Sequence, residues 1–513
     1  MKVLLMHRDR TFDTQRMMPP NEQALMQDLE LGVLLSAMAG EDKFLQEVTR
    51  RAILSGLSDI DEILYRQSTL KDCLKNPRVV REIYKVAEET TAGEKGIWGW
   101  YNPYKSTDQI LGRSVKVLQL CVGKLKELRG IVDQHSGEFG SEGFKALFAM
   151  LKGELSDEYL ASVQALLNGL ESSDGTLIRA ELGQGNKGTN YALCRQPEKK
   201  QGRMARVFGT NEPRQFTYSL DTNDNTGTEM LSRLRDRGIN EVANTLAQSS
   251  DHVLGFFTSL RTELAFYVGC LNLQDLLTRK GEPTCFPTPR ARGERALSFE
   301  GLYDACLTLK LNQRVVPNDL NAEGKDLVVI TGANRGGKST LLRSIGLAQL
   351  MMQCGAFVAA KSFTSDLSEG LFTHFKREED TTMRSGKLDE ELRRMSEIVD
   401  NLSSDSAVLF NESFAATNER EGSEISRQIV GALLERRVKV FFVTHQYEFA
   451  HSLYEKKMAN AVFLRAERKA GGERTFKVVE GEPLETSYGE DLYDHIFLGA
   501  APAPEPAAPA TTR

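Results

Sequence analysis

Apolar residues recur at helical spacing through most of the first half of the chain. The clearest runs cover residues 23–38, 59–90 and 230–277, and three shorter runs lie between residues 104 and 170. The run at 230–277 is long enough to predict one extended helix rather than a member of a compact bundle. The pattern therefore predicts a helical module over residues 1–282.

Short runs of strand type dominate the second half of the chain. Residues 326–331, 406–411 and 438–444 are mainly apolar, which is typical of strands buried on both faces of a sheet. Residues 339–352 carry apolar positions at helical spacing between the first two of these runs. The alternation of strands and helices predicts an α/β domain over residues 300–498.

Three further segments differ in composition from these two regions. Glycines punctuate short β-type runs over residues 174–220, which predicts an insertion in the helical module. The proline-containing segment 283–299 predicts a linker, and the low-complexity tail 499–513 is expected to be disordered.

Composition supports a chain of several domains with sizeable cores, because 40% of its 513 residues are hydrophobic and 27% are charged. We find no secretory segment and no apolar stretch of bilayer-spanning length, so we expect no membrane partner. The seven cysteines show no paired spacing, which favours a cytoplasmic location.

One segment is locally basic although the net charge of the whole chain is −6. Residues 179–214 hold eight basic residues against three acidic ones. The basic residues are Arg179, Lys187, Arg195, Lys199, Lys200, Arg203, Arg206 and Arg214. Such a patch can bind nucleic-acid phosphates, although a solvated hairpin would have the same composition.

The turn after the strand at 326–331 carries the most specific motif. Residues 332–339 fit the pattern G-x-x-x-x-G-K-[ST] at every fixed position, which predicts a site for a nucleoside triphosphate and Mg²⁺. We expect Lys338 to be exposed and to reach the β- and γ-phosphates, and Ser339 to ligate Mg²⁺. The predicted ATP-binding residues are Gly332, Ala333, Asn334, Arg335, Gly336, Gly337, Lys338, Ser339 and Thr340.

Polar residues end the other two predicted strands. Asn411 and Glu412 follow one strand, at the place where such folds put the Mg²⁺-associated group and the residue that activates water. His445 follows the next strand and is a candidate for sensing the γ-phosphate. Alternatively, Glu412 is an acid at a helix N-terminus and His445 is a surface histidine.

Together these motifs resemble the MutS family. The resemblance covers about residues 300–495 and rests on the loop sequence and on several shorter matches. These are Thr331-Gly-Ala-Asn-Arg-Gly-Gly-Lys-Ser-Thr340, Val316-Pro-Asn-Asp319, Gly355-Ala-Phe-Val-Ala359, Thr444-His445 and Ser487-Tyr-Gly489, with Tyr65-Arg-Gln67 upstream. The resemblance implies helical core and lever elements, a clamp-like insertion at 174–220 and a P-loop ATPase of ABC type.

The resemblance also implies a homodimer that closes over two ATP molecules and so changes its grip on DNA. Within it, Lys338 would stabilise phosphate charge, Ser339 and Asn411 would hold Mg²⁺, Glu412 would be the general base and His445 would sense the γ-phosphate. Glu391 matches a family acid near the nucleotide and is a further candidate.

The chain departs from the family pattern at three places. The family's Asp-Glu pair is Asn411-Glu412, its Gly-Arg-Gly-Thr-Ser stretch is Phe414-Ala-Ala-Thr-Asn418, and Arg335 stands where an apolar residue is usual. An amide adds no charge beside Mg²⁺, which predicts weak ATPase activity; alternatively, Asn411 is a harmless replacement within a working site.

The mismatch-reading Phe-x-Glu motif does not stand near the N-terminus, so we expect binding to duplex or branched DNA without mismatch preference. Two alternatives stay open, a nucleotide-gated clamp or scaffold with little hydrolysis and an ABC-type ATPase that does not act on DNA.

Overall fold

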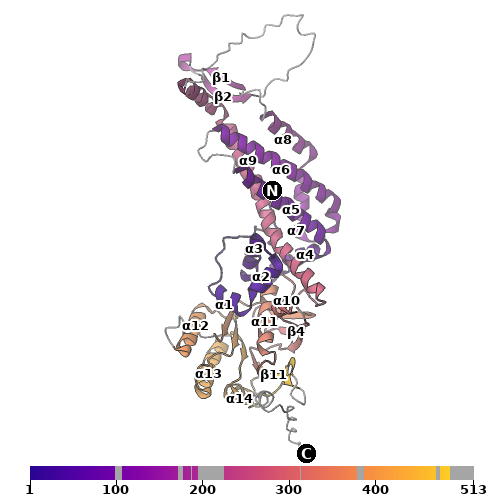
Figure 1. Cartoon of the computed structure of the whole chain (residues 1–513), viewed down its shortest axis with the longest axis vertical. Coiled ribbons are helices and arrows are strands. Elements are labelled where there is room, and N and C mark those ends of the chain that lie inside the picture. Colours follow the sequence, from indigo (N-terminus) through magenta and orange to yellow (C-terminus); the bar gives the residue numbers. More distant parts are fainter. Residues whose placement is uncertain are drawn as a thin grey trace, which may run out of the picture. The chain divides into compact units, whose positions relative to one another are not determined.

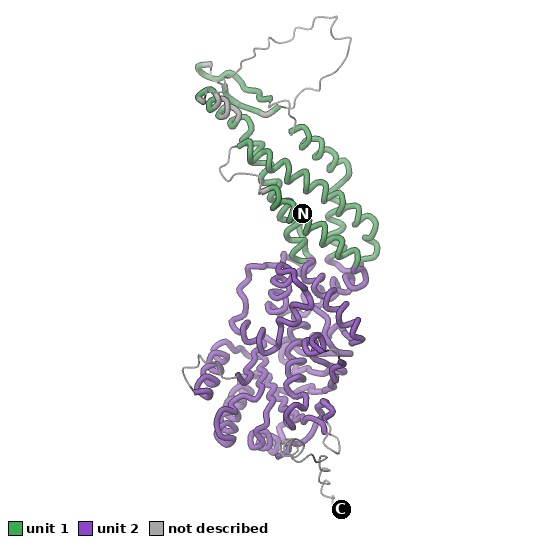
Figure 2. The backbone as a smooth tube through the Cα atoms, viewed as in Figure 1, with its two compact units in different colours: residues 1–4, 78–140, 144–263 green, residues 5–77, 141–143, 264–513 purple. Residues whose placement is uncertain are grey.

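The computed structural model describes residues 1–98, 107–170, 177–186, 188–194, 225–311, 313–377, 386–468 and 474–485. The chain divides into two compact units (Figure 2). Unit 1 comprises residues 1–4, 78–140 and 144–263, and unit 2 comprises residues 5–77, 141–143 and 264–513. Helices come first along the chain and an α/β region follows, in agreement with the apolar pattern (Figure 1).

Unit 1 consists mainly of helices. Its elements are α5 (Pro77–Trp98), α6 (Thr107–His135), the 3₁₀ turn η1 (Ser136–Glu138), α7 (Glu142–Glu154), α8 (Asp157–Leu170), β1 (Leu177–Leu182), η2 (Gln184–Asn186), β2 (Gly188–Cys194) and the first part of α9 (Asn225–Arg279). Three phenylalanines, Phe139, Phe144 and Phe148, pack together with ring centroids 4.5 to 5.5 Å apart. The 55-residue helix α9 confirms the long helix predicted over 230–277.

A β-hairpin lies where the glycine-punctuated runs predict an insertion. Strands β1 and β2 pair antiparallel, from Leu177 opposite Cys194 to Leu182 opposite Gly188. Of the eight basic residues of the segment, only Arg179 lies in the described part of the chain.

The helical part of unit 2 begins with α1 (Glu22–Asp28), α2 (Leu31–Ala39), α3 (Lys43–Leu54) and α4 (Ile60–Lys75). The apolar run at 23–38 forms two helices, because Glu30 adopts a left-handed φ of 54° and separates α1 from α2. The Glu30 carboxylate accepts a hydrogen bond from Arg343 at 2.7 Å and pairs with Lys310. These two cations stabilise Glu30 in its position at the break.

A six-stranded sheet forms the centre of the α/β part of unit 2. Its spatial order is β12-β11-β6-β10-β9-β8, and only β12 runs antiparallel to its neighbour. The strands are β6 (Leu327–Thr331), β8 (Leu371–Phe375), β9 (Ala407–Asn411), β10 (Lys439–Val443), β11 (Ala461–Arg468) and β12 (Arg474–Glu480). The buried runs predicted at 326–331, 406–411 and 438–444 are thus confirmed as β6, β9 and β10.

Helices cover both faces of this sheet. They are α11 (Lys338–Gln353), α12 (Lys387–Asn401), α13 (Glu419–Glu435) and α14 (Tyr447–Glu455). Met395, Val430 and Phe449 of α12 to α14 share one core cluster with Val408, Phe410 and Phe442 of the strands. A methyl group at Gly346 of α11 would lie 2.7 Å from Leu409, whose side chain points to the other face because strand residues alternate.

Unit 2 contains a second sheet of four strands, whose strands lie before and after β6 in the sequence. Its order is β3-β7-β4-β5, and its strands are β3 (Thr288–Arg290), β4 (Leu297–Leu302), β5 (Asn318–Asn321) and β7 (Ser362–Asp366), with α10 (Ala305–Lys310) after β4. The segment 283–299 therefore carries β3 and the start of β4. The domain limits at 282, 299 and 498 stay a prediction.

The carboxyl end of α11 is held by the helical part of the same unit. Gln353 accepts a hydrogen bond from the Leu57 amide at 2.7 Å, and Cys354 accepts one from the buried Arg66 guanidinium at 3.0 Å. A cation near the last carbonyls of a helix interacts favourably with its dipole. Among the described helices, none is both long and apolar enough to cross a bilayer.

Candidate functional site

The carboxyl ends of three parallel strands bring the predicted site together. Strand β10 lies between β6 and β9, and its last residue, Val443, is opposite both Ile330 and Asn411. Backbone hydrogen bonds continue past the strand ends. The Thr444 amide donates to the Ile330 carbonyl oxygen at 3.0 Å, and the Glu412 amide donates to that of Val443 at 2.9 Å. Side chains that follow neighbouring parallel strands meet at this edge, which is where α/β sheets bind ligands.

The loop between β6 and α11 is a tight turn. Gly332 and Gly337 have φ values of 111° and 92°, which residues with a Cβ rarely adopt. Arg335 has a φ of 60° although it is not a glycine, and its side chain is exposed. Helix α11 starts at Lys338, so its first N–H groups face the turn, an arrangement that suits an anionic phosphate group.

Lys338 is buried, which corrects the expectation that it is exposed. Its side chain is 4% exposed, and its ammonium donates to the carbonyl oxygens of Gly332 at 2.7 Å and Ala333 at 3.0 Å. Burial lowers the pKa of Lys338, and the charge of Glu412 opposes this lowering. The loop curls around the lysine, so its own carbonyls bind the ammonium group.

The two residues predicted to hold Mg²⁺ are in direct contact. The Ser339 hydroxyl donates to the Asn411 side-chain oxygen at 2.8 Å. Both groups offer oxygen atoms, which Mg²⁺ prefers, but neither carries a charge. The donor set therefore fits a hydrated Mg²⁺ that is held in part by substrate phosphates.

The remaining predicted residues surround this pair. Glu412 directly follows Asn411 and has a left-handed φ of 53°. His445 is exposed and lines a small pocket that also includes Thr331 and Gly332. The strands thus bring together the phosphate loop, Asn411, Glu412 and His445. Residues 487–489 of the sequence match lie outside the described residues.

The segment that replaces the family's Gly-Arg-Gly-Thr-Ser stretch has a structural role at both ends. Phe414 is fully buried with a φ of 59°. The Asn418 side chain caps α13 by accepting a hydrogen bond from the Glu421 amide at 3.0 Å.

Glu391 lies near the turn that follows Glu412, together with His374 and Ser413, which the sequence did not indicate. Glu391 of α12 is 3% exposed; burial raises the pKa of its carboxyl, and the Phe414 backbone amide opposes this effect. His374 of β8 and Ser413 are also buried and contact each other. No motif marks His374, because it stands in the middle of a strand of ordinary composition.

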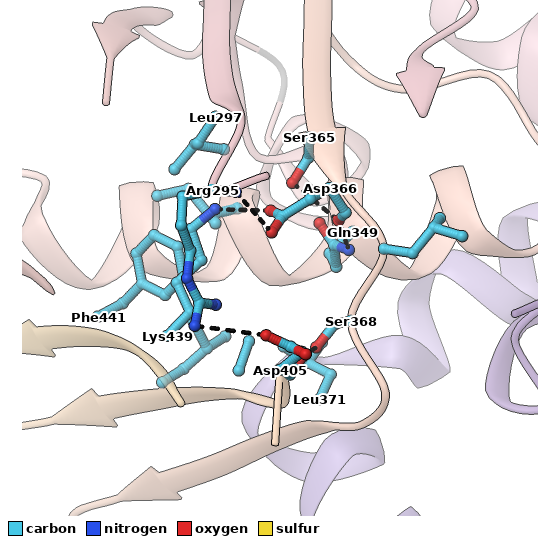
Figure 3. Close-up of a pocket in the computed structure, with 14 residues that line it drawn as sticks. Arg295, Leu297, Gln349, Ser365, Asp366, Ser368, Leu371, Asp405, Lys439 and Phe441 are labelled. Carbon is cyan, nitrogen blue, oxygen red and sulfur yellow. Dashed lines mark hydrogen bonds and ion pairs between the residues drawn. The ribbon is translucent and has the colours of Figure 1, made fainter. Parts of the chain in front are cut away.

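A second cluster of charges lies at the opposite, amino edge of the same sheet (Figure 3). Lys439, the first residue of β10, pairs with Asp366 at 2.8 Å, and Arg295 pairs with Asp405 at 3.4 Å. The cavity between them measures about 20 Å³, which has room for one water molecule and none for a nucleotide. The candidate site is therefore the carboxyl edge.

Comparisons with known proteins agree with a helical region followed by an α/β domain. The family model of the MutS2 N-terminal domain matches residues 58–280, and that of MutS domain V matches residues 328–499. The chain belongs to the MutS family.

Several curated proteins are similar to parts of this chain. The DNA mismatch repair protein MutS of Leptospira interrogans is 30% identical over 220 residues, which cover 42% of this chain and 26% of the relative. The protein of the same name from Thermus aquaticus is 32% identical over 177 residues, which cover 34% of this chain and 22% of the relative. The MutS protein from Protochlamydia amoebophila is 24% identical over 361 residues, which cover 68% of this chain and 39% of the relative. The matched region thus spans well under half the length of each of these relatives.

Proposed function

We propose that the chain is an ATPase of MutS type, in which ATP binding and hydrolysis switch a dimeric DNA clamp. The observation that carries this proposal is the meeting of the phosphate loop, the Ser339–Asn411 pair and Glu412 at three adjacent strand ends. Family membership supports the same assignment, since the matched α/β segment contains all of these residues.

Each residue of the site has a role in this proposal. The loop amides and the start of α11 cradle the phosphates, and Lys338 exchanges its bonds to the Gly332 and Ala333 carbonyls for bonds to phosphate oxygens. Glu412 accepts a proton from the attacking water, and His445 senses the γ-phosphate. Ser339 would hold Mg²⁺ directly and Asn411 would contact it through a water, and the bound ion would neutralise phosphate charge.

A second candidate function is a nucleotide-gated clamp or scaffold that hydrolyses ATP very slowly. Asn411 favours this alternative, because its amide adds no negative charge beside the metal and is already bonded to Ser339.

The DNA-binding part of the proposal comes from the relatives, which are named DNA mismatch repair proteins, and from the basic segment 179–214. We propose that this segment contacts the phosphates of duplex or branched DNA without mismatch preference, in mismatch repair or a related repair or recombination process. A homodimer and a cytoplasmic location complete the proposal.

Glu412→Ala tests the enzymatic part. This variant should bind ATP and remain dimeric, while its turnover falls by about 10²- to 10⁴-fold because the base is absent. Turnover is measured without DNA and with linear, branched and mismatched duplexes. Glu435→Ala, on the exposed end of α13, is the matched control and should turn over like the unmodified chain. Unchanged turnover of Glu412→Ala would remove the assignment of the base.

A salt titration tests the DNA-binding part. The logarithm of affinity should fall with the logarithm of salt concentration, with a slope of roughly 0.9 for each phosphate neutralised. Replacing Lys199, Lys200, Arg203 and Arg206 by alanine should flatten the slope and leave basal turnover intact. A tenfold preference for mismatched DNA would contradict the proposed lack of mismatch reading, and no binding at low salt would leave an ATPase that does not act on DNA.

A further inference from the structure

The backbone turns sharply directly after the proposed general base. Glu412 and Phe414, which flank Ser413, have φ values of 53° and 59°, and neither is a glycine. Residues with a Cβ adopt the left-handed region of φ at a cost in free energy, so surrounding contacts must hold the turn in place. The orientation of the Glu412 carboxylate depends on those contacts.

His374 provides the first set of contacts. This residue of β8 is fully buried, and both ring nitrogens have a partner. Nε2 lies 3.0 Å from the Glu391 carbonyl oxygen, and Nδ1 lies 2.8 Å from the Ser413 hydroxyl oxygen. The Ser413 hydroxyl also lies 2.5 Å from the carbonyl oxygen of His374 itself.

The number of available protons sets the pattern of these bonds. A carbonyl oxygen only accepts, so Nε2 carries the proton and donates to Glu391. Burial lowers the pKa of His374 to about 4, so the ring is neutral near pH 7 and Nδ1 accepts. The one Ser413 proton is then shared between two acceptors, and both belong to residue 374. Ser413 is consequently tied to His374 in either arrangement.

Helix α12 provides the second set of contacts. The Phe414 ring stacks on the His374 ring, with centroids 5.1 Å apart and an interplanar angle of 19°. The Phe414 backbone amide lowers the pKa of the buried Glu391 carboxyl, against the raising effect of burial. His374 thus connects α12, through the Glu391 carbonyl, to the turn that carries Glu412.

We infer that His374 is a positioning residue for ATP hydrolysis, which acts through the Ser413 hydroxyl to hold Glu412 in its left-handed conformation. This inference rests on the proposed function. Because the contacts lie behind Glu412 and do not include the phosphate loop, they affect the rate of the chemical step and not the affinity for ATP. A displacement of a catalytic group by about 1 Å is enough to reduce a rate by about 10²-fold.

Ser413→Ala is the first test, with Ser423→Ala as its matched control. Ser423 lies on α13, is as buried as Ser413, and its hydroxyl makes no hydrogen bond within the described residues. Single-turnover rates, the Kd for ATP and melting temperatures are measured for both. We expect Ser413→Ala to lose about 10- to 100-fold in kcat with Kd changed by less than about threefold, while Ser423→Ala keeps both values.

Two substitutions of His374 separate positioning from general packing. Gln places an amide near Nε2 and keeps the donor to Glu391, whereas Asn places an amide near Nδ1 and keeps an acceptor for Ser413. His374→Asn should retain more turnover than His374→Gln, even though Asn is smaller and leaves a larger cavity. Turnover that follows the melting temperature in both variants would reduce His374 to a structural role.

A double-variant comparison completes the test. In the Glu412→Ala background, Ser413→Ala should cause no further loss of turnover, because no base is left to position. Wild-type turnover in Ser413→Ala would overturn the inference while the proposed function stands. Absence of ATP binding and turnover in the unmodified chain would instead overturn the proposed function.

Discussion

Two buried lysines lie at opposite edges of the six-stranded sheet, and their partners differ. Lys439, at the amino edge, is 5% exposed and has the Asp366 carboxylate at 2.8 Å. Lys338, at the carboxyl edge, is 4% exposed and bonds to carbonyl oxygens of its own loop, and no carboxylate of the described chain lies within ion-pair distance of its ammonium. Burial lowers the pKa of both lysines.

The comparison distinguishes a charge that stabilises the fold from one that is available for a ligand. A buried ammonium without a counter-ion costs free energy, which an incoming anion can offset. Left-handed residues occur at both edges, Arg335 and Glu412 at the carboxyl edge and Arg295 and Asp405 at the amino edge, so the difference lies in the ion pairs that close the amino edge. The same substitution at the two lysines should therefore have opposite consequences.

Lys338→Met is the first prediction and has the largest expected effect. We expect ATP turnover to fall by at least about 10³-fold, equivalent to ~4 kcal/mol, because phosphate charge loses its main cation. The melting temperature should stay level or rise, since an uncompensated buried charge is removed. Steady-state kinetics and calorimetry check both expectations. A clear fall in melting temperature would show that Lys338 stabilises the fold.

Lys439→Met, the second prediction, should do the reverse. It leaves Asp366 buried without its ammonium partner, so the free energy of unfolding should fall by about 3 kcal/mol. Turnover per folded molecule should change little. Adding Asp366→Leu should restore most of the stability, because the unpaired charge is then removed. A loss of turnover as large as that of Lys338→Met would break the comparison.

The third prediction extends the comparison to a buried histidine. The pKa of His374 is lowered from 6.5 to about 4 by burial, so between these pH values the unfolded chain binds more protons than the folded one. Its contribution to stability is therefore present above pH 6.5 and is lost as the pH falls towards 4. His374→Gln should remove about 3 kcal/mol of this pH dependence. Chemical denaturation at several pH values checks this, with His451→Gln on α14 as the control.

Asn411→Asp is the fourth prediction and has the smallest expected effect. A carboxylate beside the metal should raise Mg²⁺ affinity or turnover by up to about tenfold, or ~1.4 kcal/mol. Asn401→Asp adds the same charge at the exposed end of α12 and is the control. Equal behaviour of the two variants would indicate that Asn411 is remote from the metal.

The sequence predicts the strands and the loop of this site well, because both depend on local patterns. Runs of apolar residues predict β6, β9 and β10, and the glycine pattern predicts the tight turn at 332–337. Parallel pairing of those strands then brings the loop, Asn411 and Glu412 to one edge.

The features that the sequence does not predict depend on contacts between distant residues. His374 and Ser413 are 39 positions apart, and they meet only because His374 pairs in register with Phe410. The break at Glu30 depends on Arg343 and Lys310, far along the chain. Burial of Lys338 depends on how the loop curls, which spacing alone does not determine.

Helix α11 has a mechanical consequence for the molecule. Its 16 residues form a rod about 24 Å long, and hydrogen bonds along its axis make it stiff. Its amino end follows the turn at Gly337, and its carboxyl end accepts hydrogen bonds from the Leu57 amide and the Arg66 guanidinium. A movement of α11 along its axis, started at Gly337, would lengthen or break the hydrogen bonds from Leu57 and Arg66 at its other end. A conformational change in the turn would therefore reach the segment around α4 without direct contact between the two.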